Sequence, residues 1–267
     1  MKNFKRVMAL SLALVTAVAF SACGGNNKTD GSAAGSADAQ ANSGSEVVYK
    51  VGTEPTFPPF DTTDDAGNIV GFDMDLITAI GEDQGFKVEF QNLQFDSLVP
   101  ALKSGQIDII AAGMNSEDEE RRSQVDFSTP YYQSGLVVAV KADNTDINGI
   151  DDLTPDMKVA AQIGTTGATK ASSVKGADVK QYNNANEPFI ELDNKGVDAV
   201  INDQPVVAYY LVNGGKGKMV GDIMEAEYYG IAAKKGNKAL VKQVNEALAA
   251  LKKNGEYDKI YKKWFGA

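Results

Sequence analysis

The residue types of this 267-residue chain restrict the chemistry that it can perform. Histidine is absent, and cysteine occurs once, at Cys23. The chain therefore has no imidazole base, no Ser-His-Asp triad, no cysteine-rich metal site and no internal disulfide. The acidic stretch 61–68 suggests calcium, but it lacks the full spacing and the closing glutamate of a calcium loop. With 36 acidic and 26 basic side chains, the chain is also a poor candidate for binding nucleic acid.

Two similar stretches place polar residues just beyond buried strands. "LKSGQIDII" (102–110) and "LDNKGVDAVI" (192–201) both contain the end of a helix, a glycine and an apolar-Asp-apolar strand. Polar residues follow each strand, Asn115 after the first and Asn202 with Asp203 after the second. In open α/β sheets, ligands bind outside the carboxyl ends of the strands. The repeat therefore predicts two lobes built alike, with a ligand cleft between them.

The elements around these residues follow an alternating pattern. Strand and helix patterns alternate over 47–112 and again over 158–212, which predicts two parallel sheets covered by helices. The turn 164–167 joins a strand to a helix in the second round. The stretches 135–142 and 228–234 are predicted strands that could cross between the lobes as hinges. A long helical stretch follows, and we expect it to return to the first lobe.

The first 46 residues have the composition of an export segment. Lys2, Lys5 and Arg6 precede an apolar run, and small residues precede Cys23, which predicts a secretory signal over 1–22. This layout resembles the bacterial lipoprotein signal, in which the cysteine is lipidated. Residues 23–46 are then the lipidated cysteine and a flexible tether, because small and polar residues dominate there. We expect a membrane-anchored protein that faces outside the cytoplasm, in the periplasm or at the cell surface.

Six motifs in register resemble those of one family. They are "GTEPTFPPF" (52–60), "GFDMDL" (71–76), "FDSLVPALKSGQIDIIAAGM" (95–114), "ERRSQVDFSTPYY" (120–132), "GTTGATK" (164–170) and "VDAVINDQP" (197–205). The chain is similar to the polar amino-acid solute-binding proteins, family 3, of ABC importers. The resemblance implies a two-lobed α/β periplasmic-binding-protein fold, the Venus flytrap of type II, with two hinge strands. Lobe 1 would comprise 47–137 and 229–267, and lobe 2 would comprise 138–228.

The resemblance also implies a function and a set of partners. A monomer without a cofactor would close on one free amino acid and deliver it to a membrane permease. The ligand is a zwitterion, whose carboxylate suits a bidentate cation and helix N-terminal N–H groups. Arg121, Thr165 and Thr166 match the family's carboxylate-binding positions. Asp203, the carbonyl of Gly113 and Asn115 match the positions that meet the ammonium group.

The side chain of the ligand would meet a separate group of residues. Phe57 and Phe95 match the positions that bracket it, and Glu54 and Gln162 lie near its pocket in relatives. Glutamine, cystine or a cationic side chain could fit, the last through cation–π contact and Glu54. We therefore expect a polar or basic amino acid.

One departure from the family pattern concerns the spacing before the arginine. The interval from Gly113 to Arg121 is one residue longer than is usual in the family. The distance from Arg121 to "DFS" at 126 is the usual one, so the extra residue lies within 114–120. This favours Arg121 over Arg122 and leaves the roles of Asn115 and Ser116 open. Two rival functions also remain open. One is an enzyme like cyclohexadienyl dehydratase, with a cleft carboxylate as general acid, and the other is an amino-acid sensor or adhesin.

Overall fold

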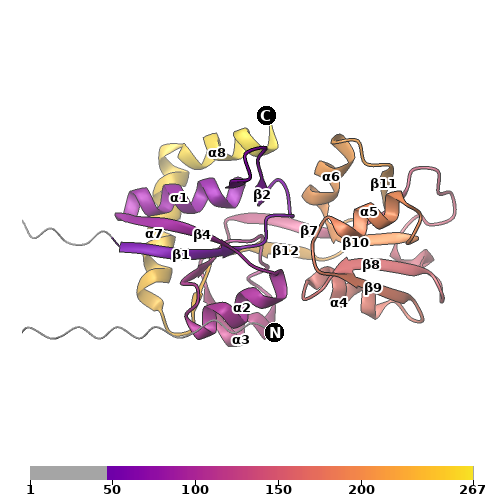
Figure 1. Ribbon diagram of the computed structural model, residues 1–267, viewed down its shortest axis with the longest axis horizontal. Coiled ribbons are helices and arrows are strands. Elements are labelled where there is room, and N and C mark those ends of the chain that lie inside the picture. The colour runs from indigo at the N-terminus through magenta and orange to yellow at the C-terminus, as the bar shows by residue number, and fades with distance from the viewer. Residues whose placement is uncertain (1–46, 267) are drawn as a thin grey trace, which may run out of the picture. The chain divides into compact units, whose positions relative to one another are not determined.

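Two β-sheets organise the part of the chain that the computed structural model describes, residues 47–266. The first sheet has the strand order β4-β1-β5-β13-β6. The second has the order β11-β7-β10-β8-β9, with β12 paired to β7 beside that path. The sheets follow one another along the length of the molecule, each with its own helices (Figure 1). We call them lobe 1 and lobe 2. The predicted signal segment and tether, 1–46, lie outside the described residues.

Lobe 1 combines the first part of the described chain with its last part. Its strands are β1 (Val47–Thr53), β4 (Phe86–Asn92), β5 (Ile109–Ile110), β6 (Val125–Phe127) and β13 (Ala232–Lys234), beside a small hairpin of β2 (Thr62–Thr63) and β3 (Ile69–Val70). Its helices are α1 (Phe72–Gln84), α2 (Phe95–Ser104), α3 (Glu119–Gln124), α7 (Lys238–Asn254) and α8 (Glu256–Phe265). The C-terminal helices pack on α1.

Lobe 2 is formed by the middle of the chain. Its strands are β7 (Tyr132–Lys141), β8 (Lys158–Gln162), β9 (Asp178–Tyr182), β10 (Ala199–Asp203), β11 (Gly217–Val220) and β12 (Ala226–Tyr229). Its helices are the short η1 (Ile150–Asp152), α4 (Thr166–Ser173), α5 (Glu187–Asp193) and α6 (Gln204–Val212). The second round of strands and helices is thus present where the pattern placed it.

The two stretches that look alike in sequence fold alike. In lobe 1, Asp108 accepts a hydrogen bond from the backbone N–H of Lys50 at 2.9 Å. In lobe 2, Asp198 accepts one from the backbone N–H of Lys158 at 2.8 Å. Each aspartate ties the residue before one buried strand to the backbone of the parallel strand beside it, at the middle of β1 and at the start of β8. Both carboxylates therefore stabilise the sheets and take no part in the cleft.

Two strands carry the chain between the lobes, and the second differs from its prediction. Strand β7 pairs with β12 near its start and with β10 and β11 further on. The stretch 228–234, predicted as one strand, is divided between β12 and β13. The division falls at Gly230, where a Cβ atom would lie 2.8 Å from the Cβ atom of Ser116. Close contact with the neighbouring loop explains why the chain bends there.

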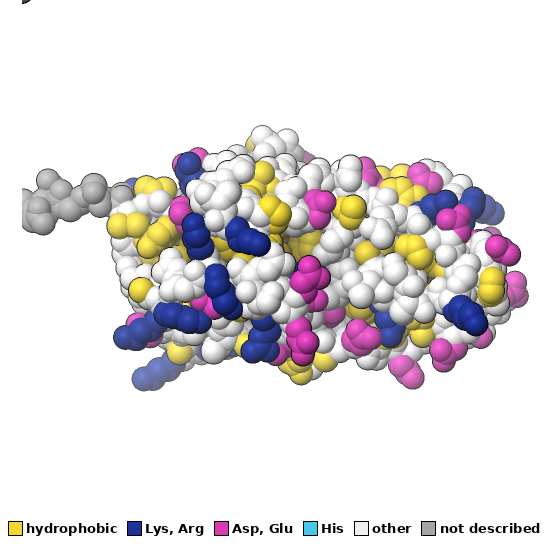
Figure 2. Space-filling view, turned by 90° about the horizontal axis from the view of Figure 1, so that it is seen from below, with side chains coloured by type: hydrophobic (Ala, Val, Ile, Leu, Met, Phe, Trp, Pro, Cys, Tyr) yellow, Lys and Arg dark blue, Asp and Glu magenta, His cyan; other side chains and the backbone are white. Residues whose placement is uncertain are grey.

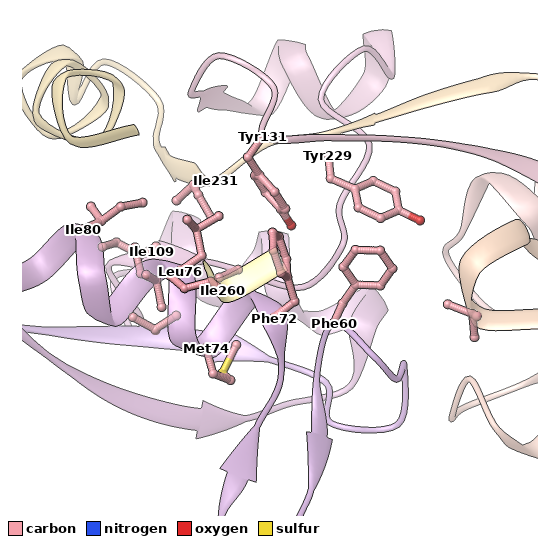
Figure 3. Packing of buried hydrophobic residues seen from close by; sticks show 14 of the residues in the cluster. Phe60, Phe72, Met74, Leu76, Ile80, Ile109, Tyr131, Tyr229, Ile231 and Ile260 are labelled. Carbon is pink, nitrogen blue, oxygen red and sulfur yellow. The ribbon is translucent and has the colours of Figure 1, made fainter. Parts of the chain in front are cut away.

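An aromatic cluster lies where these crossing strands meet lobe 1. Phe60 packs edge-on against Tyr132 and Tyr229, with ring centroids 4.9 and 5.0 Å apart. Figure 3 shows the Phe60 ring beside that of Tyr229 and the Phe72 ring near Tyr131. Phe265 of α8 joins the cluster at 5.4 Å from Phe60. The last helix therefore packs against the residues at which the lobes join.

Candidate functional site

A small cavity at the seam of the lobes brings together the predicted site residues. Lobe 1 contributes Phe57, Phe95, Gly113, Asn115 and Arg121, and lobe 2 contributes Gln162, Thr165, Thr166 and Asp203. Ala112 and Glu227 complete the lining. Of the predicted residues, Glu54 alone does not line the cavity. It accepts a hydrogen bond from the side chain of Gln162, which does. Residues far apart in the sequence thus converge on one site.

Arg121 supplies the cation of the site. Asp118 is the N-cap residue of its helix, α3, and the Asp118 carboxylate accepts the backbone N–H of Arg121 at 2.8 Å. The guanidinium group lies over the Phe95 ring, 5.2 Å from its centroid, and donates from Nη2 to the carbonyl of Gly164 at 2.8 Å. Burial lowers the pKa of Arg121, and nearby carboxylates oppose that effect. The neighbouring Arg122 is exposed and pairs with a surface glutamate, so Arg121 is the arginine of the cavity.

Opposite this cation, the turn 163–166 begins helix α4. Thr165 is the N-cap residue, and its Oγ1 accepts the backbone N–H of Ala168 at 3.1 Å. The same hydroxyl donates to the carbonyl of Gln162 at 2.7 Å. These bonds fix the first turn of α4 at the cavity, where the positive end of the helix dipole favours an anion. Arg121 and the start of α4 therefore have the charge and the hydrogen-bond donors that suit a carboxylate.

Asp203 supplies a buried anion. It stands at the N-cap position of α6, but its side chain makes no capping hydrogen bond. Instead Oδ1 accepts the hydroxyl of Tyr229 at 2.5 Å and that of Ser134 at 3.2 Å. Burial raises the pKa of Asp203 to about 6, while these hydrogen bonds and the charge of Arg121 lower it. The carboxylate is therefore held in place for a cation.

Glu227 is a second acid of this region, and sequence reasoning missed it. It is 3% exposed, lies on β12 and lines the cavity. Burial raises its pKa to about 8 and Asp203 adds to the effect, whereas a hydrogen bond with Thr166 and the charge of Arg121 lower it. Buried and more exposed residues alternate along β12, which places Glu227 on the same face as Tyr229. Glu227 lies one residue before the predicted strand 228–234, so the sequence pattern did not include it.

The loop after β5 has roles that the sequence left open. The Asn115 side-chain oxygen accepts the backbone N–H groups of Glu117 at 3.0 Å and Tyr228 at 3.3 Å, so it ties the loop to β12. Ser116 donates to the carbonyl of Tyr228 at 2.8 Å and does not line the cavity. Asn115 is thus the member of the pair that faces the ligand site.

Position 113 admits only glycine, and a buried aspartate accepts a hydrogen bond from its backbone. Gly113 has φ +54°, and a Cβ atom there would lie 2.6 Å from Cε1 of Phe57. Its N–H donates to Asp73 at 2.8 Å, and the hydroxyl of Tyr131 donates to the same oxygen at 2.6 Å. Burial raises the pKa of Asp73 to about 7. Asp73 therefore positions the loop that presents the Gly113 carbonyl.

Glu54 lies among a different set of neighbours from Asp203. It is 3% exposed and accepts hydrogen bonds from the Thr56 hydroxyl at 2.6 Å and the Gln162 amide at 3.1 Å. The Thr56 oxygen also accepts the backbone N–H of Ala185 at 2.8 Å, which is another bond between the lobes. Burial raises the pKa of Glu54. Within the described residues, Glu54 has neutral hydrogen-bond partners and forms no salt bridge.

The arrangement suits capture of a small zwitterion. A cation and a helix N-terminus lie near one another, two acids lie beside them, and Phe57 and Phe95 form aromatic walls. Over residues 47–266, no cluster of three or more potential metal-binding side chains is present. The helices described there also include none that is long and apolar enough to cross a bilayer.

Comparison with known proteins agrees with this chemistry. The model of the bacterial extracellular solute-binding proteins, family 3, matches residues 49–267. A probable histidine-binding protein of Neisseria gonorrhoeae is 38% identical over 98% of this chain and 96% of its own length. A solved ancestral arginine-binding protein bound to arginine is 46% identical, with a TM-score of 0.78, over 82% of this chain and 98% of that one.

A third relative concerns the enzyme alternative. The solved ancestral amino acid-binding protein AncCDT-1, described as a precursor of cyclohexadienyl dehydratase, is 39% identical over 82% of this chain and 95% of its own, with a TM-score of 0.77. That precursor is itself described as an amino acid-binding protein. The predicted two-lobed fold and the predicted binding function are both confirmed by these likenesses. The chain belongs to the family 3 bacterial extracellular solute-binding proteins and is an amino-acid-binding protein of the ABC-transporter type.

Proposed function

We propose that this protein binds a cationic α-amino acid, with L-arginine as its preferred ligand, and that it performs no chemical reaction on it. The observation that carries the proposal is Glu54, a buried carboxylate at the cleft without a cationic partner among the described residues. Relatives named for arginine and histidine support the same class of ligand.

The amino-acid end of the ligand would occupy the charged region of the cavity. Its carboxylate would meet the guanidinium group of Arg121 and the first N–H groups of α4, where Thr165 and Thr166 stand. Its ammonium group would meet Asp203, the carbonyl of Gly113 and the Asn115 side chain. Charge-assisted hydrogen bonds of this kind are about twice as strong as neutral ones. Any α-amino acid can use this region, so it does not select among them.

Selection would depend on the residues around Glu54. Its neighbours, Thr56 and Gln162, are distinct from the partners of Asp203, so the acids occupy separate parts of the site. An ionised carboxylate that loses water without gaining a counter-charge is costly. A guanidinium or ammonium side chain would supply that charge, and Phe57 and Phe95 could hold it by cation–π contact. A neutral side chain would leave the cost in place.

The surface around the cleft has a charge that suits such a ligand. A groove at the seam runs past the cavity, and Asp96, Asp118 and Glu120 are among its lining residues. Figure 2 shows acidic side chains in the middle of the face seen from below, with most lysines and arginines of that face over lobe 1. A negative rim raises the local concentration of a cationic ligand and speeds its association.

Closure of the lobes would complete the site. The bonds Arg121–Gly164, Gln162–Glu54 and Ala185–Thr56 all join one lobe to the other. In the proposed cycle, β7 and β12 act as hinges, with lobe boundaries near 137/138 and 228/229, and the closed monomer delivers its ligand to a membrane permease. Lipidation at Cys23 would hold it at the outer face of the membrane.

Calorimetry with a matched pair of ligands tests the proposal. L-citrulline has the length of L-arginine but a neutral ureido group. We expect the wild type to bind arginine at least about tenfold more tightly than citrulline, since a paired buried charge contributes more than about 1.4 kcal/mol to binding. Glu54→Gln should remove this preference, because it should lower the affinity for arginine and leave the affinity for citrulline unchanged. Glu82→Gln, an exposed change on α1, is the control.

Two results would contradict the proposal. Equal affinities of the wild type for arginine and citrulline would refute the charge-based selection. Conversion of the ligand, detected by mass spectrometry after incubation, would refute the claim that the protein only binds. Stoichiometric recovery of unchanged arginine is the expected outcome.

A further inference from the structure

Glu227 is a buried carboxylate of the cavity that the binding scheme above does not use. We infer that Glu227 takes up one proton when the cleft closes on an amino acid, so that ligand binding by this protein is linked to pH through that residue. The inference rests on the proposed amino-acid end of the site. It does not depend on which side chain the ligand carries.

The position of Glu227 makes it sensitive to closure. It lies on a strand that crosses between the lobes, and it faces Arg121 of α3 in lobe 1. Its other facing groups, Asp203 of β10 and Thr166 of α4, belong to lobe 2. On its own segment, Glu225 and Tyr229 are the nearby titratable groups. Groups from both lobes therefore meet around this one carboxylate only when the lobes are together.

A charge count of the closed site shows why a proton is needed. Arg121 contributes one positive charge, and Asp203 and Glu227, if both ionised, contribute two negative charges. The amino-acid end of the ligand, one ammonium and one carboxylate, adds no net charge, so one negative charge remains uncompensated in this part of the site. Burying an unpaired charge is costly, and the group changes its protonation state instead. Protonation of one acid makes the occupied site neutral.

Of the two acids, Glu227 is the one that should accept the proton. Asp203 accepts two hydroxyl hydrogen bonds, which favour its ionised form. Glu227 has the higher pKa in the closed structure, about 8 against about 6 for Asp203. With the lobes apart and water present, a glutamate has a pKa of about 4.3. At pH 7 the residue is therefore ionised before closure and protonated after it.

The proton count of binding can be measured directly. The heat of binding of L-arginine is measured at pH 7 in two buffers with different ionisation enthalpies, and again with L-citrulline. We expect uptake of close to one proton by the wild type with either ligand. By linkage, the affinity of the wild type should fall about tenfold per pH unit between pH 6 and 7.5.

Two variants separate Glu227 from the other acids. Glu227→Gln should take up about one proton less than the wild type, and its affinity should lose that tenfold dependence on pH. Glu225→Gln is the matched control, because Glu225 is 59% exposed, pairs with Lys170 and precedes Glu227 by two residues on the same segment. This variant should keep the proton uptake. The contributions of Glu54 and Asp203 are common to all three proteins and cancel in the comparison.

Several outcomes would overturn the inference. Uptake that persists in Glu227→Gln would assign the proton to another acid. No uptake by the wild type, with weakened binding by the variant, would make Glu227 an ionised partner of the ligand ammonium group. If Glu227→Gln does not fold, infrared difference spectra of the wild type must show a protonated carboxyl group appearing on binding, and their failure to do so refutes the inference. A wild type that takes up the proton but binds both ligands equally would refute only the arginine preference.

Discussion

Gly164 offers a way to test whether the lobe contact seen here is the binding-competent state. It lies in the turn before α4, has φ +76°, and its carbonyl accepts the Arg121 guanidinium at 2.8 Å. A Cβ atom on Gly164 would lie 2.9 Å from Cβ and 3.2 Å from Cα of Asp96, in α2 of the other lobe. The helix backbone of Asp96 cannot move aside as a flexible side chain could. Gly164→Ala should therefore oppose closure.

The size of the effect follows from two separate costs. The left-handed backbone conformation costs an alanine about 1–2 kcal/mol whether the lobes are open or closed. The overlap with Asp96 arises only on closure, and overpacking of this kind costs about 1–3 kcal/mol. The second cost alone enters the binding equilibrium. At about 1.4 kcal/mol per factor of ten, the affinity should fall roughly 5- to 150-fold.

The measurement compares this variant with one that carries the same backbone strain. Gly67, in the β2–β3 turn, has φ +83°, and a Cβ atom there would have no neighbouring atom within 4 Å, so Gly67→Ala lacks the clash. Both variants should lower the melting temperature of the free protein, but only Gly164→Ala should weaken arginine binding in calorimetry. An affinity of Gly164→Ala within twofold of that of Gly67→Ala would show that the contact is not part of the bound state.

Three further changes have expected outcomes. Arg121→Ala should reduce the affinity for any α-amino acid at least about 100-fold, because the ligand carboxylate loses its buried cation; near-normal affinity in calorimetry would refute its role. Tyr229→Phe removes the 2.5 Å hydrogen bond to Asp203 and should cost about 1–3 kcal/mol in urea unfolding, with the wild-type m-value. Asp73 has a pKa raised from 3.8 to about 7, so its stabilising contribution is complete below pH 3.8 and is lost as the pH rises to 7. The free energy of unfolding of the wild type should therefore fall by about 4 kcal/mol over this pH range, which is the difference between the two pKa values at about 1.4 kcal/mol per unit. Asp73→Asn should not show this fall. If the free energies of unfolding of the two proteins change in parallel from pH 4 to 8, the reasoning is refuted.

The sequence predicted this cavity well where residues belong to motifs at the ends of strands. Asp203 is the last residue of a buried strand, and Thr165 is the N-cap of the helix after another, so strand periodicity and helix capping are enough to place them. Arg121 was placed by family resemblance, since an exposed "EERR" run gives no local sign of burial. Its packing on Phe95 and its bond to Gly164 are contacts between distant segments, which no local pattern encodes.

What the sequence did not predict lies where the chain crosses between lobes. The stretch 228–234 has the composition of one strand, but a tertiary contact of Gly230 with Ser116 divides it. Glu227 precedes that stretch, and the charges that act on it, those of Asp203 and Arg121, come from two lobes. Burial of a charged side chain at a domain seam is a property of the assembled fold, so a single sequence gives little sign of it.

The position of β12 implies that the strand about which the lobes move also contributes side chains to the binding site. Alternation along this strand places Glu227 and Tyr229 on one face, toward the cavity and Asp203. The Tyr229 ring also packs on Phe60, which stacks on Phe57, an aromatic wall of the site. Rotation of the lobes about this strand must therefore shift the acid that receives the proton, the tyrosine that holds Asp203 and the wall beside the ligand. Ligand affinity and lobe closure should then respond together to any change in this strand, because the same side chains contribute to both.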